Sequence, residues 1–150
     1  MPRRIPIPFG EAFPKGAFAV GDVEPLRDFD KSSRDKIVQA VDEDSGEPIW
    51  TLDVIDADDD ATKTTRSLSV RIVAAYKPLL PDMPTGMPSA FSFMRPVEFV
   101  GLSASPYVAD SPMGNGKGRL AWSFRATGMK APGIDAKPTK PGPAAKENAA

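Results

Sequence analysis

The segment 36–55, KIVQAVDEDSGEPIWTLDVI, constrains the fold most, because it has the pattern of two strands joined by an acidic turn. Its second arm places Trp50, Leu52 and Val54 on one face, with the period of two that a half-buried strand requires. The intervening DEDSGEP is polar and contains a glycine and a proline, which favour a chain reversal and would interrupt a helix. The segment therefore predicts a β-hairpin.

Composition narrows the class of protein. With 17 Pro and 12 Gly among 150 residues, short strands and turns are favoured over a helical bundle. Cysteine and histidine are absent, which disfavours disulfides, Cys/His zinc sites, Cys nucleophiles and Ser-His dyads. We therefore expect one domain that is not an enzyme and carries no cofactor. No uncharged run is long enough for a membrane span, and the first nine residues do not resemble a signal peptide; this predicts a cytoplasmic protein that does not contact a membrane.

Four further segments alternate between apolar and polar residues, and we expect each to be a strand: residues 15–23, 66–73, 97–107 and 118–129. The clearest alternations turn one set of apolar side chains toward a core: Leu68, Val70, Ile72, Leu120, Trp122 and Phe124. Trp50 and Trp122 are both expected to be buried.

The remaining segments are expected to be connections or ends. Residues 1–14 contain closely spaced prolines and predict an extended N-terminal arm, whereas residues 131–150, rich in Lys, Pro and Ala, predict a disordered tail. The proline-rich segment 77–96 also carries Met and Phe, so we expect it to pack over the mouth of the fold; the alternative is a mobile lip for a partner. The acidic run 56–60, DADDD, is expected to be a solvated loop, with a metal site as the alternative.

Five or six strands within residues 15–130 predict an all-β fold, a small antiparallel barrel. An OB-like barrel is favoured, because it closes with five strands and uses its loops and one face for oligonucleotides. A β-sandwich is the alternative.

Charge and strand faces point to one surface. Residues 1–60 carry 7 Lys/Arg against 15 Asp/Glu, a net −8, whereas residues 61–150 carry 12 against 5, a net +7. Basic residues placed opposite the apolar faces, with aromatic rings between them, are typical of binding to single strands. The candidate nucleic-acid-binding residues are Arg71, Phe99, Tyr107, Lys117, Arg119 and Arg125. The alternative for Phe99 and Tyr107, which are expected to share a face of one strand, is a place in the core.

Three stretches, DKIVQAVDEDSGEPIWTLDVIDAD, PVEFVGLSASPYV and GKGRLAWSFRATGM, resemble the actinobacterial plasmid replication, integration and excision activators. The resemblance covers roughly residues 15–130. It implies a cytoplasmic accessory factor of a plasmid or integrative conjugative element that promotes replication and excision, and it identifies no site residues.

These observations lead to two hypotheses. The first is a non-enzymatic DNA-binding accessory protein that binds single-stranded DNA. The second is a protein-interaction module that recruits replication or recombination proteins without binding DNA itself. The sequence predicts no oligomeric state.

Overall fold

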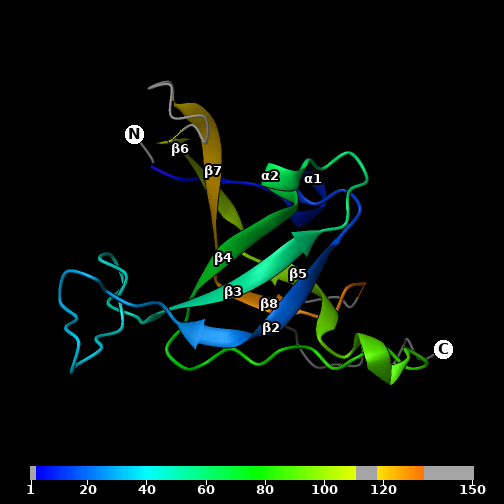
Figure 1. The fold of residues 1–150 in the computed structure, drawn as a ribbon, viewed down its shortest axis with the longest axis horizontal. Helices are drawn as coiled ribbons and strands as arrows, with labels where there is room; N and C mark the ends of the chain where they lie inside the picture. The colour runs from blue at the N-terminus through cyan, green and yellow to red at the C-terminus, as the bar shows by residue number, and fades with distance from the viewer. Residues whose placement is uncertain (1–2, 111–117, 134–150) are drawn as a thin grey trace, which may run out of the picture.

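The structure, a computed structural model, describes residues 3–110 and 118–133, and in this part of the chain strands dominate (Figure 1). The strands are β1 (Ile5–Pro6), β2 (Ala17–Pro25), β3 (Ile49–Asp56), β4 (Ser67–Val73), β5 (Met94–Val100), β6 (Ser103–Ala109), β7 (Arg119–Ala126) and β8 (Gly128–Lys130). Helical structure is limited to α1 (Phe9–Ala12), α2 (Lys63–Arg66) and the single-turn 3₁₀ helix η1 (Ser89–Phe91). The predicted all-β class is confirmed.

The strands form a Greek-key barrel. β2, β3 and β4 pair antiparallel in chain order, and β5 returns to pair with β2, the spatial order 4-1-2-3 that defines the Greek key. β7 then lies parallel to β4, and β8 pairs antiparallel with β5. Only Thr127 separates β7 from β8. The continuous segment β7–β8 therefore joins β4, at one edge of the four-stranded unit, to β5, at the other edge. The predicted small OB-like barrel is thus confirmed, but the curled sheet has eight strands where five or six were expected. One strand pair, β4–β7, is parallel in an otherwise antiparallel sheet.

Six of the strands are seven to nine residues long, and β1 and β8 are shorter. The expected strand 97–107 is divided between β5 and β6, and the expected strand 118–129 is divided between β7 and β8. Gly101, which has a φ of 65°, makes the first bend, and a Cβ on it would lie 2.3 Å from Oγ1 of Thr127 at the second bend. The two bends therefore pack against each other. Beyond them, β6 and β7 extend away from the barrel as a two-stranded ladder (Figure 1).

The first arm of the predicted hairpin is not a strand. Residues 36–41 belong to the long connection between β2 and β3, which is held by the isolated bridges Arg27↔Gln39 and Val41↔Pro48. β2 and β4 pair with most of β3, so this segment reaches only the first residue of β3, where the N–H of Ile49 donates a hydrogen bond to the carbonyl of Ala40 at 2.9 Å. The predicted chain reversal is present, since Val41 bridges Pro48 and the N–H of Asp42 donates to the carbonyl of Glu47 at 2.8 Å. The pairing expected between β3 and the next predicted strand, β4, is present over seven residue pairs.

The N-terminal segment packs on the rest of the domain. The expected extended arm over residues 1–14 is therefore wrong for residues 5–13. β1 pairs with β6, and the short helix α1 leads to Phe13, which is 2% exposed. Phe13 packs with the rings of Phe9, Phe99 and Phe124 at centroid distances of 5.2–6.3 Å. These aromatic contacts close one end of the barrel. The tail expected from residue 131 lies outside the described residues from residue 134 onward.

The core follows the predicted alternation in the barrel but not beyond it. Leu52, Val54, Val70 and Ile72 are buried, as expected. Trp50 is half-buried, and its Nε1 donates a hydrogen bond to the carbonyl of Ala74 at 3.0 Å. Trp122 was expected in the core and is instead 47% exposed, because it lies on the part of β7 that precedes the pairing with β4.

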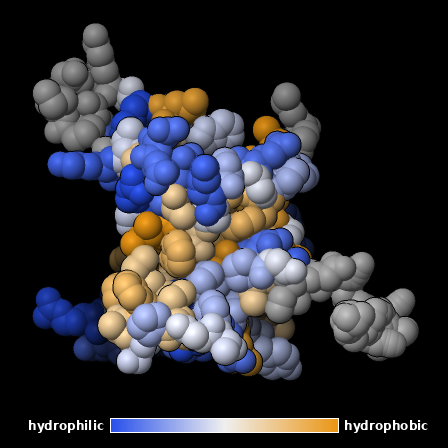
Figure 2. All heavy atoms as spheres, turned by 90° about the vertical axis from the view of Figure 1, so that its right-hand side faces the viewer, coloured by the Kyte–Doolittle hydropathy of each residue, from blue (hydrophilic) through white to orange (hydrophobic). Residues whose placement is uncertain are grey.

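The segment between β4 and β5 packs on the barrel only in part. Leu80 contacts the core, and the carbonyl of Pro81 accepts a hydrogen bond from Arg95 Nη1 at 3.0 Å. Other apolar residues of this segment are exposed: Tyr76, Leu79, Phe91 and Phe93. Figure 2, a view from the right-hand side of Figure 1, shows an apolar band across this side of the molecule with hydrophilic side chains above it.

Within residues 3–110 and 118–133, no helix is long and apolar enough to cross a membrane.

Candidate functional site

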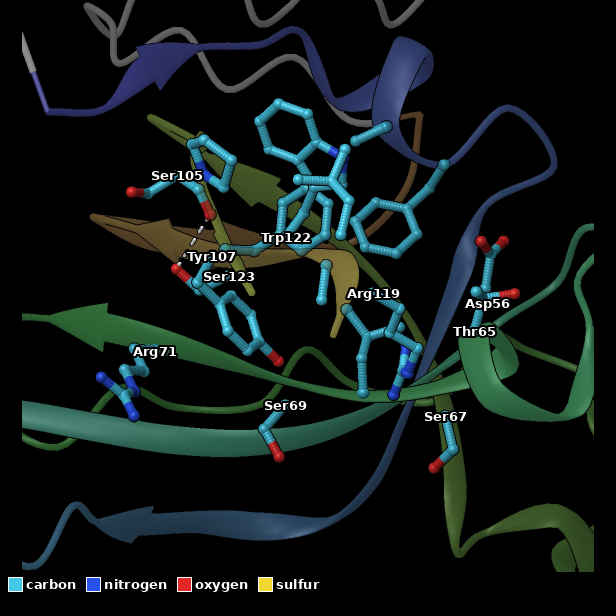
Figure 3. Close-up of a pocket in the computed structure, with 17 residues that line it drawn as sticks. Asp56, Thr65, Ser67, Ser69, Arg71, Ser105, Tyr107, Arg119, Trp122 and Ser123 are labelled. Atoms are coloured by element: carbon cyan, nitrogen blue, oxygen red, sulfur yellow. Dashed lines mark hydrogen bonds between the residues drawn. The ribbon is translucent and has the colours of Figure 1, made fainter. Parts of the chain in front are cut away.

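A groove lies where β4 and β7 separate. The two strands pair only through Val70–Ile72 and Phe124–Ala126, and their preceding residues diverge. The resulting groove has a volume of about 840 Å³ and is lined by β4, β6, β7 and the end of α1 (Figure 3). The groove exists because β7 pairs with β4 in a parallel register over three residue pairs only. A strand joined to β4 by a hairpin would be antiparallel and would have paired with β4 along most of its length.

The groove has apolar and polar lining residues. The apolar ones include Phe13, Leu68, Leu120, Trp122 and Phe124, and the polar ones include Ser67, Ser69, Arg71, Ser105, Tyr107, Arg119 and Ser123. Tyr107 and Arg119 project into the space between β7 and β4, while Arg71 lies toward one end and Asp56 toward the other (Figure 3). This arrangement offers a ligand apolar surface and positive charge together.

Two aromatic rings in the groove are open to solvent. Tyr107 is 50% exposed and Trp122 is 47% exposed. Their register partners in the β6–β7 ladder are Ala121 and Pro106 respectively, so the two rings lie on opposite faces of the ladder. Each ring is about half exposed beside a small or rigid register partner, and exposed rings of this kind stack on nucleic-acid bases.

Two arginines in the groove are exposed and without partners. Among the residues that the structure describes, the side chains of Arg71 and Arg119 take part in no hydrogen bond or ion pair. The acidic neighbour on β3, Asp53, is occupied by the hydroxyl of Ser69, which donates to it at 2.7 Å. Both guanidinium groups are therefore available to an anionic ligand.

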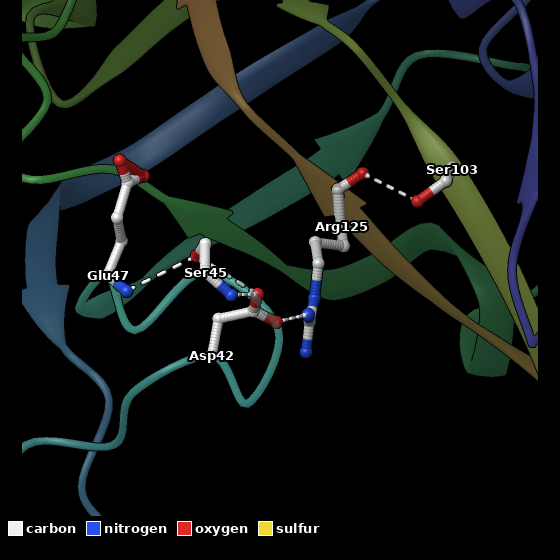
Figure 4. A network of polar contacts seen from close by, with 5 residues as sticks. All are labelled: Asp42, Ser45, Glu47, Ser103 and Arg125. Carbon is white, nitrogen blue, oxygen red and sulfur yellow. Dashed lines mark hydrogen bonds and ion pairs between the residues drawn. The ribbon is translucent and has the colours of Figure 1, made fainter.

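The third predicted arginine, Arg125, is engaged. Its Nη1 binds the carboxylate of Asp42, and its carbonyl accepts a hydrogen bond from the Ser103 hydroxyl (Figure 4). Asp42 also accepts hydrogen bonds from the N–H and the hydroxyl of Ser45, each at 3.0 Å. The Ser45 N–H is the main cause that lowers the pKa of Asp42, with the Ser45 hydroxyl and the charge of Arg125 adding to it.

The structure places three of the predicted residues, Arg71, Tyr107 and Arg119, in the groove. Arg125 is aligned with Arg71 but is not a lining residue, and Phe99 is separate from the groove. Phe99 is 3% exposed and lies on β5, whereas Tyr107 lies on β6. The expectation that these rings share a face of one strand is wrong, and Phe99 cannot stack on a ligand, because it packs on Phe9 and Phe13. Lys117 lies outside the described residues.

Two residues in or near the groove were not among the predicted binding residues. Trp122 was assigned to the core, since alternation identifies the face of a strand but not the point at which the strand leaves the barrel. Arg4, half-buried beside β1, lies near Arg125 and Arg71. Its proximity depends on the pairing of β1 with β6, about a hundred positions later in the chain, for which the local sequence carries no signal.

The acidic run 56–60 forms a turn. Carboxylate oxygens of Asp56 and Asp58 accept hydrogen bonds from the backbone N–H groups of Asp58 and Asp60, at 3.0 and 3.1 Å. In the described ranges, no group of three or more acidic side chains is arranged to hold a metal ion.

Three comparisons with known proteins were made, and no family model, curated protein or solved structure matches the chain. The groove and its residues are therefore the basis for the function proposed below.

Proposed function

We propose that this chain is a non-enzymatic accessory protein that binds single-stranded DNA in the groove between β4 and β7. The observation that carries the proposal is a pair of arginines, Arg71 and Arg119, whose side chains have no partner among the described residues and which line the groove with two exposed rings, Tyr107 and Trp122. Positive charge attracts the phosphate backbone, and aromatic rings stack on bases of any sequence. Stacking requires bases that are not already paired, which favours a single strand over a duplex.

The barrel supports this choice. OB-like barrels bind oligonucleotides on the face of their second and third strands and on adjacent loops. In this chain those strands are β3 and β4, and β4 forms one wall of the groove. The long connection between β2 and β3 reaches the neighbouring Arg125 through Asp42.

The resemblance to plasmid replication, integration and excision activators supplies a biological setting for the proposal. Both replication and excision of an element expose single strands, and a protein that binds them would act in the cytoplasm on the DNA of a plasmid or integrative conjugative element. We place the chain in this setting as part of the same proposal.

The test is fluorescence anisotropy with a labelled single-stranded oligonucleotide and the matching duplex, over a series of salt concentrations. We expect the single strand to bind more tightly. In the double variant Arg71→Gln/Arg119→Gln, affinity should fall, and the slope of log K against log salt should decrease by roughly 1.4, about 0.7 for each lost phosphate contact.

The matched control is Arg34→Gln/Lys36→Gln, which removes the same charge from exposed positions in the connection between β2 and β3, outside the residues that line the groove. This variant should keep the wild-type affinity and most of the wild-type salt slope. Equal losses in the two double variants would show that only total charge matters, and the groove would not be the site.

One observation favours a second function, the recruitment of a replication or recombination protein. Tyr76 and Leu79, three positions apart in the segment between β4 and β5, are each 85% exposed, and exposed large apolar side chains are typical of protein interfaces when they form a patch. If the wild-type chain binds no DNA at low salt, this function becomes the leading one. The test is then the loss of binding to a purified replication or recombination protein of the element in Tyr76→Ser/Leu79→Ser.

A further inference from the structure

Three arginines from distant parts of the sequence share one face of the sheet. In the register of the strands, Arg71 on β4 is aligned with Arg125 on β7, Arg125 with Ser103 on β6, and Ser103 with Pro6 on β1. Residues aligned in this way point to the same face. Arg4 lies in the bend immediately before β1, and the charges of Arg125 and Arg71 act on it, so the three arginines lie near one another at this face. We refer to these three residues as the arginine cluster.

The positive charge of the arginine cluster is only partly balanced. Asp42 is the acidic residue that contacts it in the described part of the chain, through an ion pair with Arg125. Burial is the main cause that lowers the pKa of Arg4; the charges of Arg125 and Arg71 lower it further, and Asp42 raises it. Two positive charges and one negative charge thus act on Arg4.

The cluster also has hydrogen-bond donors without acceptors. Nη1 of Arg4 and Nε of Arg125 are buried, and neither has a hydrogen-bond partner among the residues described. Buried donors on charged groups are rarely left unpaired in proteins, and such exceptions often mark the place of a ligand or an ion. Arginine remains protonated at any physiological pH, so these donors cannot be relieved by loss of a proton.

We propose that the arginine cluster binds one phosphate group, and that the carboxylate of Asp42 occupies the position of one of its oxygens. Planar guanidinium groups offer paired N–H donors whose spacing matches the oxygens of phosphate. Asp42 is held in place from outside the cluster by Ser45, so it competes with the ligand. Because Arg71 also lines the groove, the phosphate is either a free anion or a backbone phosphate of a strand in the groove; the second source rests on the proposed function.

The first experiment uses inorganic phosphate as the probe. The full chain is titrated with sodium phosphate against sodium chloride at constant ionic strength and pH, and binding is followed by NMR of the arginine side chains. We expect saturable binding that Arg4→Gln weakens by about tenfold, the effect of losing one charged hydrogen-bonding partner. Asp42→Asn removes the competing charge and should strengthen binding several-fold.

Arg3→Gln is the matched control, because it removes the same charge from the exposed neighbouring residue and should leave phosphate binding unchanged. The proposal is overturned if phosphate gives no more effect than chloride, or if Arg3→Gln and Arg4→Gln weaken binding equally. It is also overturned if Asp42→Asn, shown to be folded by its amide spectrum, leaves binding unchanged.

A second experiment identifies the source of the phosphate with the labelled oligonucleotide. If a backbone phosphate binds, Arg4→Gln should also lower DNA affinity and reduce the salt slope by roughly 0.7. If only the free anion binds, DNA affinity should be the same in Arg4→Gln and the wild type. The two proposals fail separately: phosphate binding without DNA binding would refute the proposed function alone, whereas DNA binding that needs Arg119, without phosphate binding, would refute the arginine cluster alone.

Discussion

Replacement of Phe99 by alanine tests the assignment of this ring to the core. Phe99 is nearly completely buried, and its ring centroid lies 6.1 Å from that of Phe9 and 6.3 Å from that of Phe13. A buried Phe→Ala change costs about 3–5 kcal/mol of unfolding free energy, through lost apolar burial and the cavity that remains. With an unfolding entropy of about 2.1 cal/mol/K per residue over the 124 described residues, we expect the melting temperature to fall by roughly 12–19 °C.

The assay is urea unfolding followed by circular dichroism, with calorimetry for the melting temperature. Phe99→Leu is the control, because it keeps most of the side-chain volume and should cost less than about 1.5 kcal/mol. The reasoning is refuted if Phe99→Ala loses less than about 1 kcal/mol while its affinity for single-stranded DNA falls, since the ring would then be a binding residue and the core would lie elsewhere.

Three further predictions follow from other parts of the molecule. Trp122→Ala should lower single-strand affinity by about 1–3 kcal/mol in an anisotropy titration, and unchanged affinity would remove this ring from the site. Gly101→Ala should destabilise the fold by roughly 1–3 kcal/mol, since its φ is positive and the new Cβ would meet Thr127; Thr127→Ala in the same chain should recover part of that loss in urea unfolding, and no recovery would contradict the contact. The N–H of Ser45 lowers the pKa of Asp42, so the stability that this carboxylate contributes is present above its unfolded pKa of about 3.9 and is lost as the pH falls through the lowered value in the folded state. The difference in unfolding free energy between wild type and Asp42→Asn should therefore shrink between pH 5 and pH 3, and a constant difference would contradict the assignment.

The barrel was predictable where burial follows a local repeat. The alternation of Leu68, Val70 and Ile72 predicted β4 and its buried face. The same reasoning failed for Trp122, because the pattern of β7 continues unchanged past the residue at which pairing with β4 begins. It also failed for residues 36–41, which have the apolar content of a strand but form only isolated bridges, because β2 and β4 pair with most of β3.

The candidate site was predictable only in part, for a related reason. Arg71 and Arg119 could be assigned to outward faces from their own strands. Their meeting at one groove depends on the parallel pairing of β4 with β7, and the position of Arg4 depends on β1 joining β6. Both are pairings between segments far apart in sequence, which no local pattern encodes.

The continuous run of β7 and β8 also determines how this protein must fold. Its residues Phe124–Ala126 pair with Val70–Ile72, 54 positions earlier, and its final residues pair with β5. Contacts of such high sequence separation require the closure of long loops before any stabilisation is gained. We therefore expect refolding on the scale of milliseconds to seconds, roughly as in other small barrels. Since this run supplies Arg119, Trp122 and Arg125, the groove and the arginine cluster form only in the step that closes the barrel, and a partly folded chain has neither.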